Sequence, residues 1–249
     1  MLTNKKFLTK ILDSFKSFIE SGTSRSTSKL KPLHGAIATD LAAVLGDAYE
    51  IKSLGYAEDK ESQIEGRYIC KKVDITIIHK ATNKVAAGIG VKFVMQNYAQ
   101  NSNNYFENML GETANIRASS TPYFQIFIIP EVLPYFKDSG EIGRWEEFSE
   151  YHMKKYCALA KDNTAIFPHT PNKTLLYVVQ IHPKANSVQT KTEYFNYYKD
   201  LIPKLTIKSA DCSYPDFELG GTVIINDYCI RSFCKCYIFS VIILHFTCF

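Results

Sequence analysis

Apolar residues near the N-terminus recur three or four positions apart between residues 3 and 20. This spacing places them on one side of a helix, so we expect an amphipathic helix that packs by that face. The polar residues 21–28 that follow are typical of a flexible linker. A second helix is predicted over 32–46, because Pro32 suits its first turn and Gly46 follows its last. The apolar stripe of the first helix consists of Phe7, Leu8, Ile11, Leu12, Phe15, Phe18 and Ile19.

Strands are predicted after the second helix. An extended stretch over 49–56 leads to a charged turn at 58–61, and a long strand is expected over 67–79. Thr82-Asn83 then turns the chain into a further strand over 85–94. Together these segments predict a run of consecutive strands with short connections.

The rest of the chain alternates between helical and extended segments. A helix is expected over 103–117, a buried strand over 124–129, a helix over 144–160 and a strand over 175–181. The aromatic segment 194–198 is expected to pack in the core. The order through residue 130 is helix, three strands, helix and strand, which predicts the α/β class with a mixed central sheet flanked by helices.

Composition is that of a globular chain. Its 249 residues are 46% hydrophobic and 22% charged, and no run of 18 apolar residues suggests a membrane span. The net charge is +4, and residues 1–35 hold seven Lys and Arg against two acidic residues. A basic N-terminal arm over 1–31 is therefore expected, either to contact a polyanion or to keep the chain in solution. No glycine-rich phosphate loop follows any predicted strand.

The seven cysteines show no CxxC pair, and the chain starts without an apolar secretory signal. We therefore expect thiols in a reducing cytoplasm and no zinc site. The six histidines follow no metal or nucleophile pattern. The last residues, 229–249, are apolar, rich in cysteine and unlike the rest, which a translated frameshift or truncated reading frame explains better than a tail anchor. The expected division is the arm at 1–31, a main domain at 32–228 and this tail.

The residues that carry chemistry lie on two predicted strands. Asp74 interrupts an apolar stretch, where a carboxylate is costly unless it has a partner such as a metal ion. Side chains alternate along a strand, so Gly88, Gly90 and Lys92 share one face, and Asp74 and Thr76 share one face of the preceding strand. If the two faces coincide, Asp74 and Lys92 converge. A structural ion pair and a catalytic pair both explain this arrangement.

A carboxylate beside a lysine suits phosphodiester hydrolysis, in which Mg²⁺ meets the scissile phosphate and the ammonium offsets developing charge. In the sequences Lys-Lys-Val-Asp-Ile and Gly-Val-Lys-Phe, the chain resembles the PD-(D/E)xK nuclease superfamily, and within it the type II restriction endonucleases. The resemblance covers residues 32–130, the expected core of the domain.

The resemblance implies a restriction-endonuclease-like fold and Mg²⁺-dependent cleavage of double-stranded DNA by a homodimer. It also implies a cognate DNA methyltransferase in the same cell. A repair or recombination nuclease on the same fold, and an inactive DNA-binding remnant, are the alternative functions.

The chain departs from the family at Gly90, where an acidic residue usually precedes the lysine. Some restriction enzymes carry this carboxylate on the next helix. Glu107 and Glu112 lie on opposite edges of the buried stripe predicted for that helix, and Glu107 is preferred for its spacing. Glu65 and Glu50 are further candidates. The predicted metal ligands are thus Asp74 with one of these glutamates.

Candidate DNA contacts surround these residues. Basic side chains suit phosphates, and amide side chains suit adenine edges or phosphates. Surface charges, and a solvated loop that caps the helix with Asn103 or Asn104, explain the same residues. The candidates are Lys71, Lys72, Asn97, Gln100, Asn101, Asn103, Asn104 and Arg117.

Overall fold

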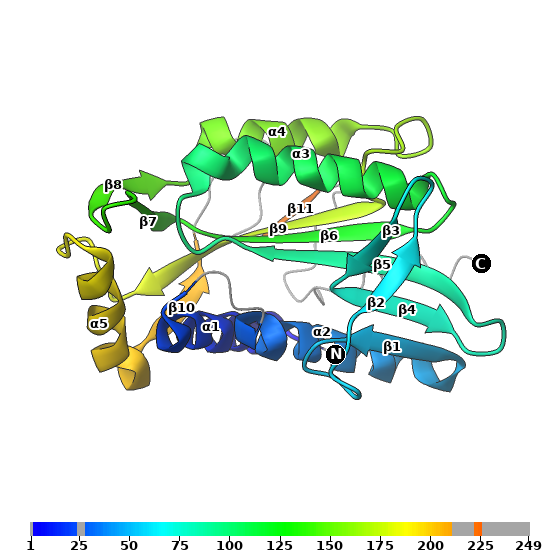
Figure 1. The fold of residues 1–249 in the computed structure, drawn as a ribbon, viewed down its shortest axis with the longest axis horizontal. Helices are drawn as coiled ribbons and strands as arrows, with labels where there is room; N and C mark the ends of the chain where they lie inside the picture. Colours follow the sequence, from blue (N-terminus) through cyan, green and yellow to red (C-terminus); the bar gives the residue numbers. More distant parts are fainter. Residues whose placement is uncertain (1, 24–27, 211–221, 226–249) are drawn as a thin grey trace.

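The computed structural model of the chain describes residues 2–23, 28–210 and 222–225. A mixed sheet of seven strands lies at its centre, in the order β1-β4-β5-β6-β9-β10, with β11 also paired to β9 (Figure 1). β1, β4 and β5 are antiparallel, whereas β5, β6 and β9 run parallel. The strands are β1 Tyr49–Ser53, β4 Ile75–His79, β5 Lys84–Phe93, β6 Tyr123–Pro130, β9 Lys173–His182, β10 Thr206–Ser209 and β11 Thr222–Ile225.

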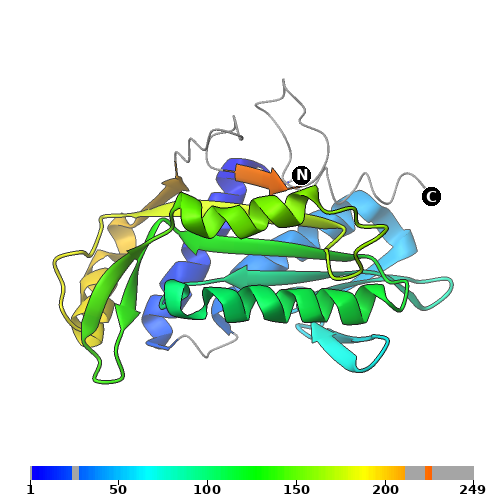
Figure 2. The same ribbon diagram turned by 90° about the horizontal axis from the view of Figure 1, so that it is seen from above.

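Helices cover both faces of this sheet (Figure 1). α1 Asn4–Ser21 and α2 Lys31–Leu45 lie on one side. α3 Tyr98–Arg117 and α4 Glu150–Lys161 lie side by side over the other, as Figure 2 shows from above. α5 Lys191–Leu201 packs against α1 at one end. The predicted α/β class, a mixed central sheet flanked by helices, is confirmed. Short 3₁₀ turns are η1 Ser28–Leu30, η2 Gly46–Ala48 and η3 Ile202–Lys204.

The predicted N-terminal helix belongs to the main core. The Thr3 hydroxyl caps its start and Gly22, at φ 65°, ends it. It contacts α2, α5 and β10, and each large side chain that it buries contributes about 1.5–3 kcal/mol. Its basic residues therefore stand on the outer side of a core helix and not on a detached arm. The fully buried apolar side chains of α1 are Phe7, Ile11, Phe15, Phe18 and Ile19.

The segment predicted as one strand over 67–79 divides at Asp74. Before Asp74 it forms β3 Cys70–Val73, which pairs with β2 Ser62–Glu65 in a separate two-stranded hairpin. After Asp74 it forms β4, which lies between β1 and β5 in the main sheet. The prediction of one continuous strand was wrong because the chain changes partners at this residue. The first strand of this hairpin, β2, directly follows the charged turn expected at 58–61, where no strand was predicted.

Two predicted helix boundaries were also wrong. α3 begins at Tyr98, five residues before the expected start, so its first turns contain most of the amide-rich run. The residues before Glu150 form the hairpin of β7 Val132–Phe136 and β8 Ile142–Glu147 instead of a helix. α4 begins only where Ser149 and His152 form a reciprocal cap.

Other features follow the predictions. Every residue of β6 is buried, and the aromatic segment lies in α5, where Tyr194, Phe195 and Tyr198 are buried in the main core. Cys70 and Cys157 are thiols. Across the described ranges, none of the helices has the length and apolar character needed to cross a membrane. Part of the predicted linker, 24–27, and the tail at 229–249 lie outside the described residues.

Candidate functional site

Asp74 occupies the junction between the β2–β3 hairpin and the main sheet. The backbone N–H of Val91 donates to its carboxylate Oδ2 at 2.7 Å. Thr76 pairs with Gly88 in the β4–β5 register, so the two faces expected to coincide do so. This register brings Asp74 to the part of β5 that carries Lys92.

The environment of Asp74 disfavours its charged form. Burial raises the pKa of the carboxyl to about 7, and the negative charges of Glu61 and Glu112 act in the same direction. The Val91 hydrogen bond and the positive charge of Lys92 oppose this rise. A divalent cation at this point would favour the carboxylate form, because ligand carboxyls must lose their protons to bind it.

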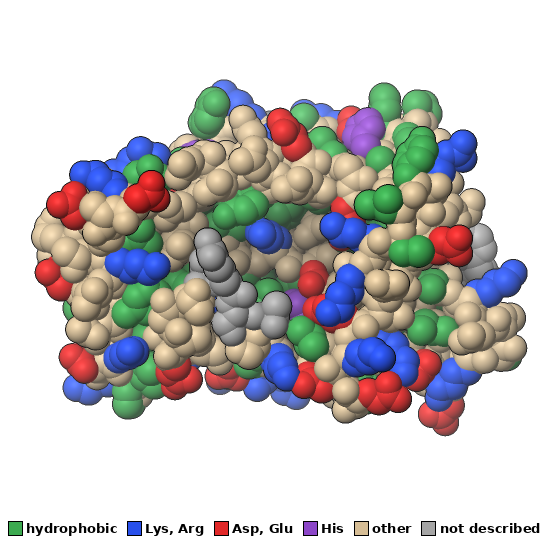
Figure 3. All heavy atoms as spheres, viewed as in Figure 1, with side chains coloured by type: hydrophobic (Ala, Val, Ile, Leu, Met, Phe, Trp, Pro, Cys, Tyr) green, Lys and Arg blue, Asp and Glu red, His purple; other side chains and the backbone are tan. Residues whose placement is uncertain are grey.

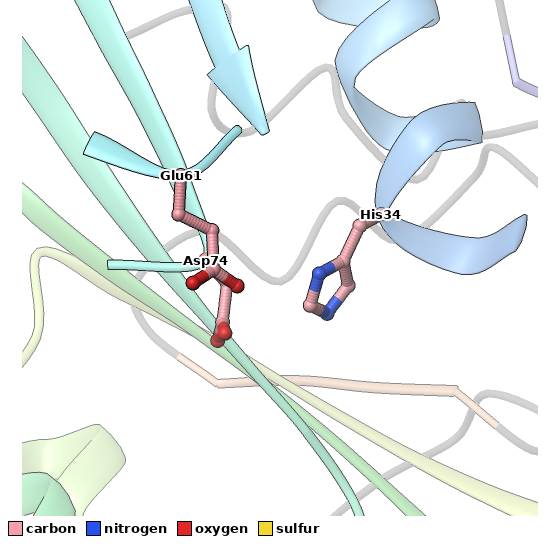
Figure 4. A group of neighbouring side chains, drawn as sticks. All are labelled: His34, Glu61 and Asp74. Atoms are coloured by element: carbon pink, nitrogen blue, oxygen red, sulfur yellow. The ribbon is translucent and has the colours of Figure 1, made fainter. Parts of the chain in front are cut away.

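The side chains of His34, Glu61 and Asp74 come from separate segments and lie close together (Figure 4). His34 comes from α2, Glu61 precedes β2 and Asp74 follows β3. Their candidate ligand atoms all lie within 4.8 Å of one another. A nitrogen and two carboxylate oxygens are atoms that can bind a divalent cation, so the three residues are a candidate metal site.

His34 is a buried histidine with no hydrogen-bond partner for either ring nitrogen among the described residues. Burial lowers its pKa to about 4, so the imidazole is neutral and keeps a lone pair at neutral pH. Buried polar atoms usually find partners, so an unpartnered ring facing two carboxylates fits a metal ligand. His34 was not predicted from the sequence, because there it is an isolated histidine within a predicted helix.

Lys92 lies on the same side of the sheet as α3. Its ammonium stands 4.4 Å from the centroid of the Tyr105 ring. Partial desolvation lowers the pKa of Lys92, while the charges of Asp74 and Glu112 act to raise it. Lys92 is therefore close to both acidic groups and remains exposed enough to meet a ligand.

Glu112 is the glutamate that α3 directs to this site. Its Oε1 accepts a hydrogen bond of 2.5 Å from the Tyr123 hydroxyl, and its Oε2 pairs with Lys71 at 3.0 Å. The side chain is only 22% exposed. These contacts fix its carboxylate near Asp74 and Lys92.

Glu107, the preferred candidate, lies elsewhere. Its side chain is exposed, and its charge acts on Lys155 of α4. Desolvation lowers the pKa of Lys155, and the negative charge of Glu107 partly opposes that change. Among the charges that act on Asp74, Glu107 is absent while Glu61 and Glu112 are present. The geometry therefore favours Glu112 over Glu107.

The two remaining glutamate candidates do not join the cluster. Glu65 is exposed at the far end of β2. Glu50 on β1 pairs with Lys52 at 2.7 Å. Glu61, which was not among the candidates, contributes instead and pairs with Lys72 at 2.9 Å. Its position in a charged turn gave no signal of this role.

Lys71 and Lys72 border the site, since each pairs with one of its acids, Glu112 and Glu61. Arg117 has a different role from the one expected. Its guanidinium donates to the backbone carbonyls of Thr164, Phe167 and Thr170, which anchors the loop after α4. A phosphate contact by Arg117 is therefore not favoured, because three of its five N–H donors are already engaged.

The amide run is partly structural. The Asn97 side chain donates to Phe136 O at 2.9 Å and accepts from Phe136 N at 3.0 Å, and Asn101 donates to Asn97 O at 3.0 Å. These bonds hold the start of α3 to β7, so base contacts by Asn97 and Asn101 are not favoured. Gln100 and Asn104 are exposed on α3 and remain candidate contacts.

A buried lysine also lies near the site. Lys29 in η1 is 7% exposed, and desolvation together with the positive charge of Lys92 lowers its pKa to about 8. Figure 3 shows the surrounding face, which is hollowed between α3 and the α1–α2 layer, with basic, acidic and histidine side chains in and around the hollow. Two lysines and a cluster of acids together fit a phosphate held by a cation.

The space that a family carboxylate would need at Gly90 is filled. A Cβ built on Gly90 would lie 2.3 Å from the Tyr123 hydroxyl and 2.7 Å from Gln125 Oε1. Both side chains are buried on β6. The hydroxyl that excludes a side chain at position 90 is the one that binds Glu112.

Gly90→Ala is therefore expected to lower the free energy of unfolding by about 1–3 kcal/mol, the usual cost of overpacking. Gly111→Ala is the matched control, because Gly111 lies on α3 with nothing within 4 Å of an added Cβ. That control is expected to be neutral or slightly stabilising. Urea unfolding of both variants measures the difference, and equal stability would contradict this packing of Tyr123 and Gln125 against Gly90.

Comparisons with protein-family models, with curated proteins and with solved structures found no match for this chain.

Proposed function

We propose that this chain is a metal-dependent endonuclease that cleaves double-stranded DNA, acting as a type II restriction enzyme. One observation carries the proposal: Asp74, Glu61 and His34 converge within 4.8 Å, next to Lys92. A cytoplasmic location, a homodimer on a two-fold-symmetric site and a cognate methyltransferase in the same cell belong to the same proposal.

The residues divide the work of phosphodiester hydrolysis. Asp74, Glu61 and His34 would hold a cation, Mg²⁺ or Mn²⁺, and such a cation would supply polarisation of a phosphate oxygen and activation of water. Lys92 stabilises the extra negative charge that develops on the scissile phosphate. Glu112 is fixed by Tyr123 and faces the same space, where its carboxylate accepts a proton from, or orients, the attacking water.

Lys71 and Lys72 are suited to the DNA backbone next to the cut. In the free protein they neutralise Glu112 and Glu61. With a cation held by Glu61, Lys72 would be able to meet a phosphate, and Lys71 would lie beside Glu112 next to the cut.

The ligand set also bears on the choice of metal. Mg²⁺ prefers oxygen ligands, whereas Mn²⁺ accepts an imidazole nitrogen more readily. We therefore expect Mn²⁺ to support cleavage at a lower concentration than Mg²⁺. His34→Asn, which removes the ring, is expected to reduce that difference.

The experiment is cleavage of supercoiled plasmid by the purified full-length chain over a titration of each metal, with EDTA as the control. Nicked and linear products that require the metal, with cuts at a defined sequence, are expected. A folded protein that gives no product with either metal would overturn the enzymatic function. DNA binding without cleavage would indicate the inactive remnant.

A further inference from the structure

The β2–β3 hairpin links the candidate metal centre to an exposed tip. Glu61 immediately precedes β2 and Asp74 immediately follows β3, so two cluster residues stand at its base. The hairpin forms its own two-stranded sheet and lies beside α3 (Figures 1 and 2). Its tip, residues 66–69, is therefore connected to the site by a short, paired strand on each side.

Two large apolar side chains point away from the protein at this tip. Tyr68 is 79% exposed and Ile69 is 62% exposed. Leaving two adjacent large apolar side chains in water costs the free energy that their burial would contribute. Their exposure indicates a surface that binds something.

The tip is held rigidly from behind. The buried Asn115 side chain on α3 accepts from the N–H groups of Tyr68 and Ile69, at 2.9 and 3.2 Å. It also donates to Ile69 O at 2.9 Å, while the Asn115 carbonyl accepts from Arg67 N at 2.8 Å. Gly66 lies so close that a Cβ there would meet the Asn115 amide at 2.0 Å. A tip fixed in this way loses little conformational entropy on binding.

Charge on the hairpin identifies the kind of partner. Arg67, Lys71 and Lys72 outnumber the single acid, Glu65, and the Arg67 guanidinium lies 5.8 Å from the Tyr68 ring centroid. Basic side chains around an exposed aromatic and aliphatic pair are typical of elements that enter DNA between stacked bases. Lys71 and Lys72 pair with Glu112 and Glu61 inside the protein, whereas Arg67 lies at the tip itself. DNA offers a phosphate to Arg67 and bases to the apolar pair, which an apolar protein surface would not do.

We propose that the hairpin tip inserts into duplex DNA beside the cut, with Tyr68 stacked on a base and Ile69 against its neighbour. The inference rests on the proposed nuclease function. Ile69 precedes Asp74 by five positions, so the tip lies about 16 Å along the strand from the candidate metal centre. That length spans about five stacked base pairs, which places the distorted step at that separation from the scissile phosphate.

The test compares Tyr68→Ala with Tyr151→Ala, whose tyrosine is 78% exposed on α4 and serves as the matched control. Cut positions are first mapped on plasmid with the wild-type chain. Duplexes are then made with 2-aminopurine at successive positions around the cut and a non-cleavable linkage at the scissile phosphate. Binding and fluorescence are measured with Mn²⁺ present.

The wild-type chain and Tyr151→Ala are expected to raise 2-aminopurine fluorescence at one step about five base pairs from the cut. Tyr68→Ala is expected to lose this signal and to bind the duplex about 10–100-fold more weakly. Thermal unfolding verifies that both variants are folded, as the exposure of the two rings predicts.

Specific outcomes would overturn the insertion. One is a wild-type chain that cleaves DNA without a fluorescence rise at any position; another is Tyr68→Ala with unchanged binding. Loss of a wild-type dimer in Tyr68→Ala, measured by light scattering, would assign the tip to a protein contact. Failure of the proposed function is distinguished at the first step, because no cut would then be mapped.

Discussion

Asp74→Asn is expected to abolish metal-dependent DNA cleavage, with a loss of at least about 10²–10³-fold in rate. Asparagine retains an oxygen that accepts the Val91 hydrogen bond but carries no charge for a cation. Glu61 and His34 alone would leave the cation with too few ligands near Lys92. Plasmid nicking by the purified variant over a Mn²⁺ titration measures the effect.

The same substitution is expected to stabilise the metal-free protein. The folded-state pKa of Asp74, about 7, lies above its ordinary value, so the folded chain holds the proton more tightly than the unfolded chain. Between about pH 4 and pH 7 the unfolded carboxyl is ionised while the folded one is neutral, and wild-type stability falls as pH rises. Above about pH 7 the carboxyl is ionised in both the folded and the unfolded chain, and the full free-energy cost of burying its charge remains.

Asp74→Asn is thus expected to unfold at a higher temperature than the wild type in EDTA, by an amount that grows from pH 4 to pH 7 and then levels off. The gain is at most on the order of 4 kcal/mol, because the rise from 3.8 to about 7 is about three pKa units and already includes the opposing effect of Lys92. Asp138→Asn, at an exposed position in the β7–β8 turn, is the control and should change neither cleavage nor stability. Normal cleavage by Asp74→Asn would remove Asp74 from the active site.

The sequence predicted the parts of the fold that depend on local periodicity. The stripe of α1 and the unbroken apolar run of β6 describe faces that must be buried, and both are. The hairpin before Asp74 was missed because β3 and β4 form one extended apolar–polar pattern, and nothing local marks the change of partner. Only the pairing with β2 and β1 distinguishes them.

The residues of the candidate site likewise fall into two groups, those that a local pattern predicts and those that only tertiary packing brings together. The closeness of Asp74 and Lys92 was predictable because strand alternation is a local rule that the β4–β5 register preserves. His34 and Glu61 come from a helix and a turn, far from β4 in sequence, and tertiary packing alone brings them together. The roles of Asn97 and Arg117 are likewise set by distant partners, the β7 backbone and the loop after α4.

The choice between Glu107 and Glu112 shows most clearly what the sequence alone does not predict. A helical wheel places both at the edges of the buried face of α3, but it does not say which edge faces the end of the sheet. Tyr123 decides, because its hydroxyl reaches Glu112 across the space that Gly90 leaves open.

Glu112→Gln is therefore expected to lower the cleavage rate about 100-fold or more, whereas Glu107→Gln stays within about twofold of the wild type. The amide oxygen of the substituted side chain still accepts from Tyr123, so the position of the side chain is kept while its charge is lost. Stability should change by less than about 1 kcal/mol, since the Lys71 pair is partly exposed. Single-turnover cleavage at saturating Mn²⁺ separates this loss from weaker metal binding. An inactive Glu107→Gln beside an active Glu112→Gln would return the role to Glu107, and full activity in both would mean that α3 supplies no carboxylate to the reaction.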